Sequence, residues 1–375
     1  MQPTAFSGLP AESLWIWGDV LRRLQGSIMD GLGFAPRSQP SRVVQILRTA
    51  RLLAYQAPDA QQPVVLAVPA PIKATYIWDL LPEVSVVKTL RSAGFQVYMV
   101  DWRAPGPEDQ TAGLEDYAEK TLAEALRKVA AETGTEKVII AGHSLGGTLA
   151  AIFASLHAES VRALVELEGP MQFKPEAGTL EAGVARSPPG NRITAGMGNV
   201  PGSFLDFASI CSDASTFLGE PWTDWSRSLL SARAIRTHCY VRRWTLSETP
   251  MPRRLFEEIL DELYRHDRFA AGTLNVGTRR ADPRTITAPI LAVMDPRSRI
   301  IPPVSINAYL TRTGSTDVRL IEYRGDVGVV LQHVGLLVGE KAHKQLWPQI
   351  LKWIRQHSAA SLDEGSPGQR GSGIR

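Results

Sequence analysis

The pattern of hydrophobic and polar positions predicts strands that alternate with helices. The most continuous apolar runs lie at 64–70, 96–102, 138–141, 163–169 and 289–294. Runs of this kind are typical of strands that are buried on both faces of a parallel sheet. Segments with helical periodicity lie between several of them, at 84–93 and 113–132. The alternation predicts an α/β fold with a mostly parallel sheet and right-handed crossover connections.

The alternation is interrupted after the strand at 163–169. Residues from 170 to about 233 are rich in Gly, Pro, Ser and aromatic side chains, and residues 234–272 read as helical. Strands resume at 289–294. The interruption predicts a cap inserted over an active site, and its aromatic, weakly charged composition indicates an acyl or otherwise apolar substrate. The alternative is a satellite core with no catalytic meaning.

This pattern divides the chain into five segments. An N-terminal helix and linker occupy 1–42, and the first part of the core occupies 43–169. The cap follows at 170–272, and the second part of the core at 273–357. The polar, Gly/Ser-rich tail at 358–375 is expected to be disordered.

The N-terminal segment contains an amphipathic helix, expected over 12–29. One stripe of this helix is apolar and consists of Leu14, Trp17, Leu21, Leu24 and Ile28. We expect this stripe to pack against the main domain or a partner subunit. The alternative is adsorption to a lipid or polymer surface.

The stretch with the clearest chemistry joins the strand at 138–141 to a helix rich in small residues. It reads Gly142-His143-Ser144-Leu145-Gly146-Gly147. A strand, G-x-S-x-G and a helix in this order predict a nucleophile elbow, in which a strained turn exposes the serine hydroxyl. Ser144 is therefore the candidate nucleophile, and the backbone N–H of Leu145 is one half of a candidate oxyanion hole. The alternative is a glycine-rich turn whose serine only caps the helix.

The second donor of the oxyanion hole should come from the loop after the strand at 64–70. Pro69 and Pro71 have no N–H to donate. The candidates are therefore Ala70 and Ile72.

The serine needs an acid and a base, which in this type of fold follow it in that order along the chain. Of the seven histidines, His333 lies between the last expected strand and the final helix, so it is the candidate base. The acid should follow the strand at 289–294, which makes Asp295 the first choice and Asp326 the second. Its carboxylate would hold the imidazole tautomer and stabilise the imidazolium. For each aspartate the alternative is the capping of a turn.

Charge and composition exclude several classes of protein. The 41 basic and 38 acidic residues give a net charge of +3, which does not suggest a nucleic-acid-binding surface. No apolar run reaches the roughly 18 residues of a transmembrane segment, and the N-terminus lacks a secretory signal pattern. Cys211 and Cys239 form no CxxC motif, which favours a reducing compartment over a disulfide or zinc framework. We therefore expect a cytoplasmic protein.

Sequence motifs for cofactors are missing. The first strand is not followed by G-x-G-x-x-G, and the chain has no Walker loop and no HExxH. We expect no cofactor and no metal site.

Several further stretches follow one another in a characteristic order. They are Tyr76-Ile77-Trp78-Asp79-Leu80, the residues 94–98 running into Asp101-Trp102, the elbow with its extra Gly147, Arg243-Trp244 followed by 255–291, and the residues 333–339 with Leu346-Trp347-Pro348. In this order they resemble the polyhydroxyalkanoate synthase family, and most of all its short, class III-like catalytic chain. The resemblance covers about residues 40–355.

The resemblance implies an α/β-hydrolase fold with a cap insertion. It implies an enzyme that polymerises 3-hydroxyacyl-CoA through a covalent acyl–cysteine, with a Cys/His/Asp set. It also implies a homo-oligomer and a second subunit as partners.

The chain departs from the family pattern in three places. Ser144 stands where the family has its cysteine. When the family's Asp-His-x-x-Pro motif is aligned on Pro302, its Asp and His positions are occupied by Ser298 and Arg299. Asp295 lies three residues before the Asp position. The segment that precedes the candidate base is longer than the family's short loop.

The serine changes the expected chemistry. A thiolate exchanges an acyl group with CoA at near balance, whereas a serine ester is more stable than the thioester and passes the acyl group on less readily. Three functions follow. The first is acyl transfer from a thioester, such as an acyl-CoA, to a hydroxyl or carrier-bound acceptor. The second is hydrolysis of a thioester or ester, as in an esterase, thioesterase or depolymerase, and the third is a non-catalytic, synthase-like partner subunit.

Overall fold

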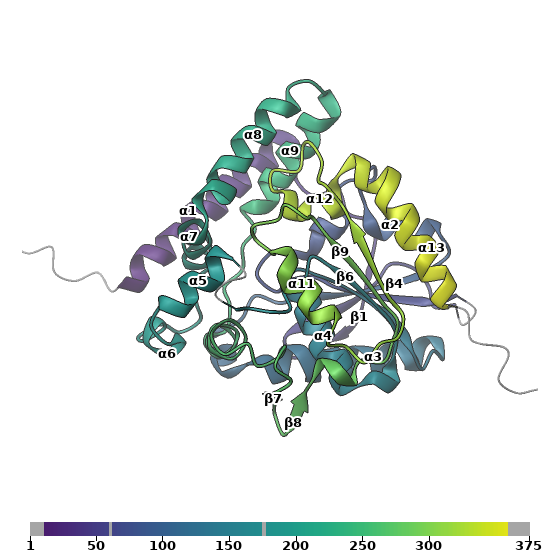
Figure 1. Cartoon of the computed structure of the whole chain (residues 1–375). Helices are drawn as coiled ribbons and strands as arrows, with labels where there is room; N and C mark the ends of the chain where they lie inside the picture. Colours follow the sequence, from purple (N-terminus) through teal and green to yellow (C-terminus); the bar gives the residue numbers. More distant parts are fainter. Residues whose placement is uncertain (1–10, 60–61, 175–177, 359–375) are drawn as a thin grey trace, which may run out of the picture.

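The computed structural model describes residues 11–59, 62–174 and 178–358, and a large sheet lies at its centre (Figure 1). Its strands are β1 (Arg42–Ile46), β2 (Ala50–Ala54), β3 (Val64–Val68), β4 (Gln96–Trp102), β5 (Val138–His143), β6 (Val161–Leu167), β9 (Ile290–Met294) and β10 (Val318–Glu322). Nearly all of the tail that we expected to be disordered lies outside the described residues.

The spatial order of the strands is β1-β2-β4-β3-β5-β6-β9-β10. The β1–β2 and β2–β4 pairs are antiparallel, and the pairs from β4 through to β10 are parallel. The α/β class and the mostly parallel sheet are therefore confirmed. β1 has no counterpart in the sequence prediction, because its residues are only half-buried or exposed and form no apolar run.

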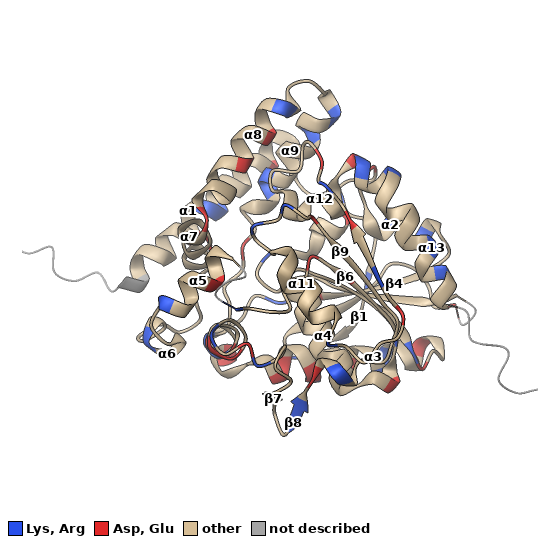
Figure 2. Ribbon diagram, in the orientation of Figure 1, with Lys and Arg blue, Asp and Glu red and all other residues tan. Residues whose placement is uncertain are grey.

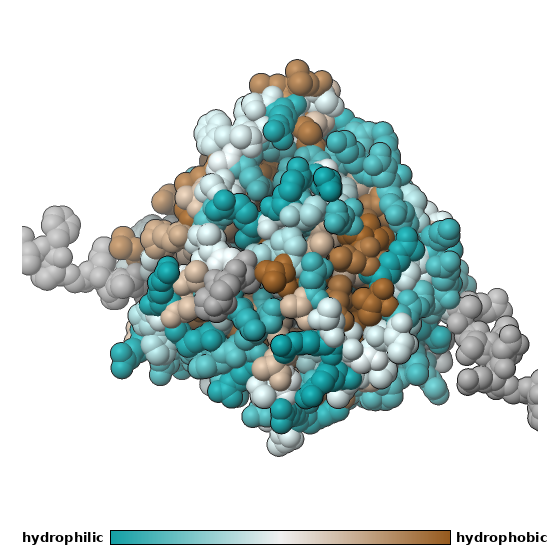
Figure 3. Space-filling view, in the orientation of Figure 1, coloured by the Kyte–Doolittle hydropathy of each residue, from teal (hydrophilic) through white to brown (hydrophobic). Residues whose placement is uncertain are grey.

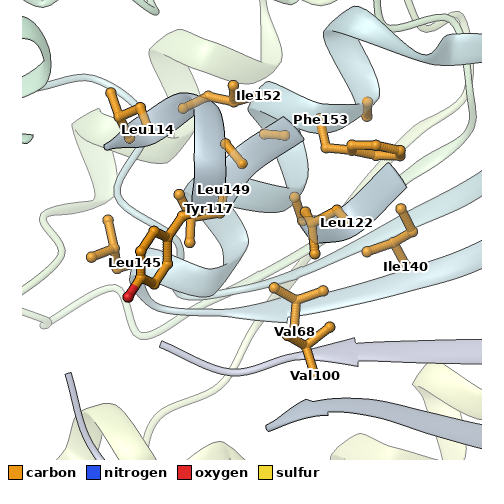
Figure 4. Close-up of a cluster of buried hydrophobic side chains, with 14 of the residues drawn as sticks. Val68, Val100, Leu114, Tyr117, Leu122, Ile140, Leu145, Leu149, Ile152 and Phe153 are labelled. Carbon is orange, nitrogen blue, oxygen red and sulfur yellow. The ribbon is translucent and has the colours of Figure 1, made fainter. Parts of the chain in front are cut away.

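Helices cover both faces of the sheet. On one face lie α3 (Thr121–Thr133), α4 (Leu145–Leu156) and α11 (Pro303–Leu310), and on the other lie α2 (Val86–Ser92), α12 (Gln332–Val338) and α13 (Trp347–Ser358). Successive residues of a central strand point to opposite layers, so that Leu66 packs with the first set and Val65 with the second. Figure 4 shows the first layer, with α4 above the strands that carry Val68, Val100 and Ile140. All residues of α4 are buried.

The chain between β6 and β9 forms a separate group of helices. They are α5 (Thr179–Arg186), α6 (Gly190–Ile193), α7 (Gly202–Ser212), α8 (Glu220–Ser228), α9 (Ala232–Thr245) and α10 (Arg253–Glu258), and a hairpin of β7 (Leu274–Val276) and β8 (Arg279–Ala281) follows. The sequence did not indicate helices before residue 234, because prolines divide this segment. Proline is compatible with a helix start, and α6, α7 and α8 begin beside Pro189, Pro201 and Pro221.

The N-terminal helix, α1 (Ala11–Met29), lies along α7 in Figure 1. The Trp15 ring lies 5.4 Å from that of Phe204, and the backbone N–H of Ser203 donates to Asp19 at 2.7 Å. The apolar stripe on α1 was expected to pack against the main domain or a partner subunit, and within this chain most of it is left exposed. Its members Leu14, Trp17, Leu21, Leu24 and Ile28 are each more than half exposed. The helix contacts α7 through the face that carries Trp15 and Asp19.

Charged residues of both signs are distributed over the outer helices in Figure 2. Hydrophobic atoms gather at the top of the view in Figure 3, where α8 meets α9, and Leu230 there is 92% exposed. None of the described helices is long and apolar enough to cross a membrane.

Candidate active site

The turn between β5 and α4 has the backbone of a nucleophile elbow. Ser144 adopts φ 55° and ψ −134°, a conformation that costs a non-glycine residue about 1–3 kcal/mol. A Cβ on Gly146 would lie 2.1 Å from the carbonyl oxygen of Val68, and one on Gly142 would lie 2.6 Å from the Cα of Gly147. Both glycines are therefore needed for the helix to approach the strands this closely.

The residues that carry the two candidate oxyanion donors line the same pocket as Ser144. Leu145 is the first residue of α4, and Ile72 lies in the loop after β3. This loop is tied to the segment between α9 and α10, because the N–H of Thr249 donates to the carbonyl of Ile72 at 3.0 Å. Ala70, the alternative donor, also lines the pocket.

The candidate base lies in the first turn of α12 rather than in a loop. The His333 side chain is 11% exposed and lines the pocket together with Ser144. Its Nδ1 lies 2.6 Å from Oε2 of Glu168. This contact leaves Nε2 as the ring nitrogen that can exchange a proton with a group in the pocket.

The carboxylate that contacts His333 in this structure is that of Glu168, not that of Asp295 or Asp326, which were expected in this position. The carboxylate of Asp295 accepts hydrogen bonds from Arg297, and that of Asp326 accepts from the Tyr323 hydroxyl and from backbone N–H groups at the start of the last helical region. Neither of these carboxylates is bonded to the imidazole, whereas Glu168 is.

Glu168 directly follows β6 and has φ 47°. The sequence carried a signal that could have identified it, because a glutamate stands at the carboxyl end of an otherwise buried strand. Side chains at the carboxyl ends of parallel strands meet at one edge of the sheet, and β6 neighbours the nucleophile strand β5.

Burial sets the protonation of this pair. It lowers the pKa of His333 to about 4, so the imidazole is neutral at neutral pH. It raises the pKa of Glu168 above its ordinary value, and the Asp295 carboxylate acts in the same direction. The backbone N–H of Asp295 opposes this rise in the Glu168 pKa, because it donates to Oε1 of Glu168 at 2.8 Å.

A second histidine supports the backbone of the first. The Nε2 of His143 lies 3.1 Å from the carbonyl oxygen of His333, and the two rings are 4.7 Å apart. Burial lowers the pKa of His143 well below its ordinary value, so this ring is also neutral. A neutral ring with its proton on Nε2 donates to that carbonyl.

The segment that leads to His333 is held by α8. The carboxylate of Asp224 accepts from the backbone N–H of Gly328 at 2.8 Å and from that of Val330 at 2.9 Å, and it pairs with Nδ1 of His238 at 2.7 Å. Val330 has φ 64°, which is strained for a β-branched residue. The longer segment noted in the sequence is therefore fixed by a buried carboxylate from the helical insertion.

The site opens into a large apolar cavity of about 910 Å³. Its walls come from the elbow, α1, the helices between β6 and β9, and the segment before α12. Among the lining residues are Phe204, Phe217, Trp244, Met251, Leu260 and Ile301. The cavity is suited to an apolar chain that ends at the serine.

Comparisons with known proteins agree with this fold. A family model described as the alpha/beta hydrolase fold matches residues 63–195. The chain is 27% identical to the poly(3-hydroxyalkanoate) polymerase subunit PhaC of Haloferax mediterranei, over 87% of this chain and 65% of that protein. It is 25% identical to the subunit of the same name from Allochromatium vinosum, over 80% of this chain and 82% of that one.

Solved structures show the same fold at low sequence identity. The monoacylglycerol lipase of Paleococcus ferrophilus has a TM-score of 0.53 and 17% identity, covering 82% of this chain and 98% of the lipase. A monoglyceride lipase from Saccharomyces cerevisiae has a TM-score of 0.53 and 13% identity, covering 87% of this chain and 96% of that one. The fold and the sequence relatives together identify the chain as an enzyme of the α/β-hydrolase superfamily that is similar, over most of its length, to poly(3-hydroxyalkanoate) polymerase subunits.

Proposed function

We propose that the protein is a serine acyltransferase that takes a 3-hydroxyacyl group from a thioester such as an acyl-CoA and passes it to a hydroxyl or carrier-bound acceptor. One observation carries this proposal. A strained serine and a histidine–glutamate pair lie together at an apolar cavity, in a chain similar to poly(3-hydroxyalkanoate) polymerase subunits. The cavity would hold the acyl chain.

In the acylation step, Oγ of Ser144 attacks the thioester carbonyl and its proton passes to Nε2 of His333. The carboxylate of Glu168 stabilises the resulting imidazolium through Nδ1. The N–H groups of Leu145 and Ile72 stabilise the oxyanion of the tetrahedral intermediate. Collapse of this intermediate breaks the carbon–sulfur bond, and the imidazolium returns its proton to the departing CoA thiolate.

The second step releases the acyl group from Ser144. His333 removes a proton from the acceptor hydroxyl, which attacks the ester and forms a new ester, and the proton returns to the serine oxygen. Water in the same position gives the free acid, and this is the hydrolase alternative. Ser144 favours hydrolysis over transfer. A serine ester is more stable than a thioester, so the acyl group stays longer on the enzyme before an acceptor removes it.

A non-catalytic partner subunit is the third reading. The relocated acid argues against it, because Glu168 restores the imidazole contact that a displaced aspartate would leave empty. We also keep a cytoplasmic location and a homo-oligomer or second subunit as parts of the proposal. The oligomer and the second subunit rest on the similarity to the polymerase subunits alone, and the cytoplasmic location rests on the sequence pattern and the cysteine usage.

The experiment is CoA release from 3-hydroxybutyryl-CoA by the purified protein, beside Ser144→Ala, with the products separated into oligomer and free acid. Oligomer that depends on Ser144 supports the transferase. Free acid that depends on Ser144 and is not diverted by added oligomeric hydroxyacids would make the protein a thioesterase. Equal CoA release by both proteins would contradict acyl transfer through this serine.

A further inference from the structure

A second carboxyl group lies directly behind the acid. Asp295 follows β9 and is almost fully buried. Its backbone N–H bonds to Oε1 of Glu168, while Oε2 of Glu168 contacts His333. The two oxygens of Glu168 are thus held by two different groups, the backbone N–H of Asp295 just after β9 and the imidazole of His333 on α12.

The charge of Asp295 is balanced by a single arginine. Arg297 donates its backbone N–H to Oδ1 of Asp295 at 2.9 Å, its Nε to Oδ1 at 3.1 Å and its Nη2 to Oδ2 at 3.0 Å. The same guanidinium also bonds to the carbonyl of Arg324. A forked pair of this geometry is stronger than an ordinary surface ion pair.

The groups that face Glu168 are otherwise neutral or acidic. His333 and His143 are neutral through burial. Glu220, on α8, accepts the backbone N–H of Gln332, and its pKa is raised by burial and also by the charges of Asp295 and Glu168. Within the described part of the chain, Arg297 is the cationic side chain that an ion pair joins to this group of carboxyls.

We propose that Asp295 and Arg297 are positioning residues for the acid. Asp295 fixes Glu168 through its backbone N–H, and Arg297 neutralises the Asp295 carboxylate, which would otherwise oppose the ionised form of Glu168 that the base requires. The inference rests on the proposed function, in which His333 accepts a proton while Glu168 is ionised. It assigns the aspartate that the sequence favoured as the acid to a different task.

The test compares Arg297→Gln, Asp295→Asn and the double variant, using kcat/KM for CoA release from 3-hydroxybutyryl-CoA between pH 5 and 9. Arg297→Gln leaves the adjacent carboxylates of Asp295 and Glu168 without a cation. The acidic limb of the pH profile should therefore lie at a pH that is higher by about one unit or more. The double variant should return the limb to the wild-type position. Arg324→Gln removes a neighbouring exposed charge that does not pair with Asp295, and it should leave the limb in place.

Two results would overturn the proposal. The first is an acidic limb in Arg297→Gln that matches the wild type. The second is a loss of about 10³-fold or more in kcat for Asp295→Asn, which would make Asp295 the acid. We expect less than a tenfold loss for that variant. Thermal unfolding of each variant checks that it is folded.

A second measurement separates this proposal from the proposed function. In Ser144→Ala, ¹⁵N-histidine NMR follows the protonation of the His333 ring without any turnover. Adding Arg297→Gln should shift that titration even if the wild-type protein releases no CoA. An unshifted titration would contradict the role of Arg297 independently of the substrate.

Discussion

At the scale of single residues, Glu168 is subject to two opposing effects. Burial favours its neutral form, and the N–H of Asp295 together with the imidazole of His333 favours its ionised form. A triad acid has to be ionised to hold the neutral imidazole in the tautomer with its proton on Nδ1. In the proposed mechanism these hydrogen bonds therefore set the tautomer of His333, and substitutions can test them.

Glu168→Gln should lower kcat by about 10³- to 10⁴-fold, because an amide can present its NH₂ to Nδ1 and select the wrong tautomer. Glu166→Gln is the matched control. Glu166 lies two positions earlier on β6 and is equally buried, but its partner is the hydroxyl of Tyr309 at 2.9 Å. We expect its kcat to stay within tenfold of the wild type. Similar losses in both variants would mean that β6 tolerates no amide, and that Glu168 has no special role.

Glu166 gives a separate prediction about stability. Burial raises its pKa from an ordinary 4.5 to about 8, so the folded protein binds a proton that the unfolded chain has lost. The stabilisation from the neutral form is complete below about pH 4.5 and is lost as the pH rises through about 8.

Glu166→Gln keeps an acceptor for Tyr309 and does not titrate. The difference in free energy of unfolding between this variant and the wild type, measured with urea, should therefore shift in favour of the variant by more than about 1 kcal/mol as the pH rises from 5 to 8.5. A difference that stays constant over this range would show that Glu166 is already ionised in the folded protein.

At the scale of elements, the elbow was predictable from the local sequence, whereas the choice between Glu168 and Asp295 as the carboxylate beside His333 was not. The elbow is local, since strand, turn and helix are adjacent in sequence and Gly142 and Gly146 mark the turn. The acid depends on which strands become neighbours. β6 and β9 are adjacent in the sheet, so Glu168 and Asp295 end at the same edge, and only the contact with His333 distinguishes them.

The face through which α1 packs against α7 could not be predicted for a similar reason. An amphipathic stripe shows which face of a helix is most apolar, but shape decides which face fits. Gly18 lets α1 approach α7 closely, because a Cβ there would lie 2.9 Å from that of Ser203. The apolar stripe is left exposed, and its adsorption to a surface or its contact with a partner subunit stays a prediction.

The contact between α8 and the segment before His333 also belongs to this scale. Asp224→Asn replaces one acceptor oxygen with a donor and should break one of the bonds to Gly328 or Val330. We expect faster hydrogen exchange at these two amides and a drop in kcat of about 10- to 100-fold, because a small displacement of the base is costly.

Thr223→Ala, an exposed change on the same helix, is the control for Asp224→Asn. It should leave both the amide exchange and kcat unchanged. Faster exchange in Asp224→Asn with a normal kcat would show that the helix stabilises the segment without positioning His333.

At the scale of the whole molecule, the cavity is a joint product of parts far apart in sequence. Leu21 of α1, Val184 of α5, Trp244 of α9 and Ile301 of the segment before α11 all line it. The aromatic composition of the insertion predicted an apolar lining. The contribution of α1 could not be predicted, because it depends on the packing of α1 against α7.

The size of this cavity predicts a preference for longer acyl chains. Its volume of about 910 Å³ lies at the upper end of the range for ligand pockets, so a four-carbon acyl group leaves most of it empty. Each buried CH₂ contributes about 0.8 kcal/mol, so kcat/KM should rise by up to about fourfold per added methylene from C4 towards C10 acyl-CoA. Val184→Phe should reduce this gain for the long chains more than for C4, whereas Val304→Phe, on the exposed side of α11, should not. A flat dependence on chain length in the wild type would mean that the acyl group does not enter this cavity.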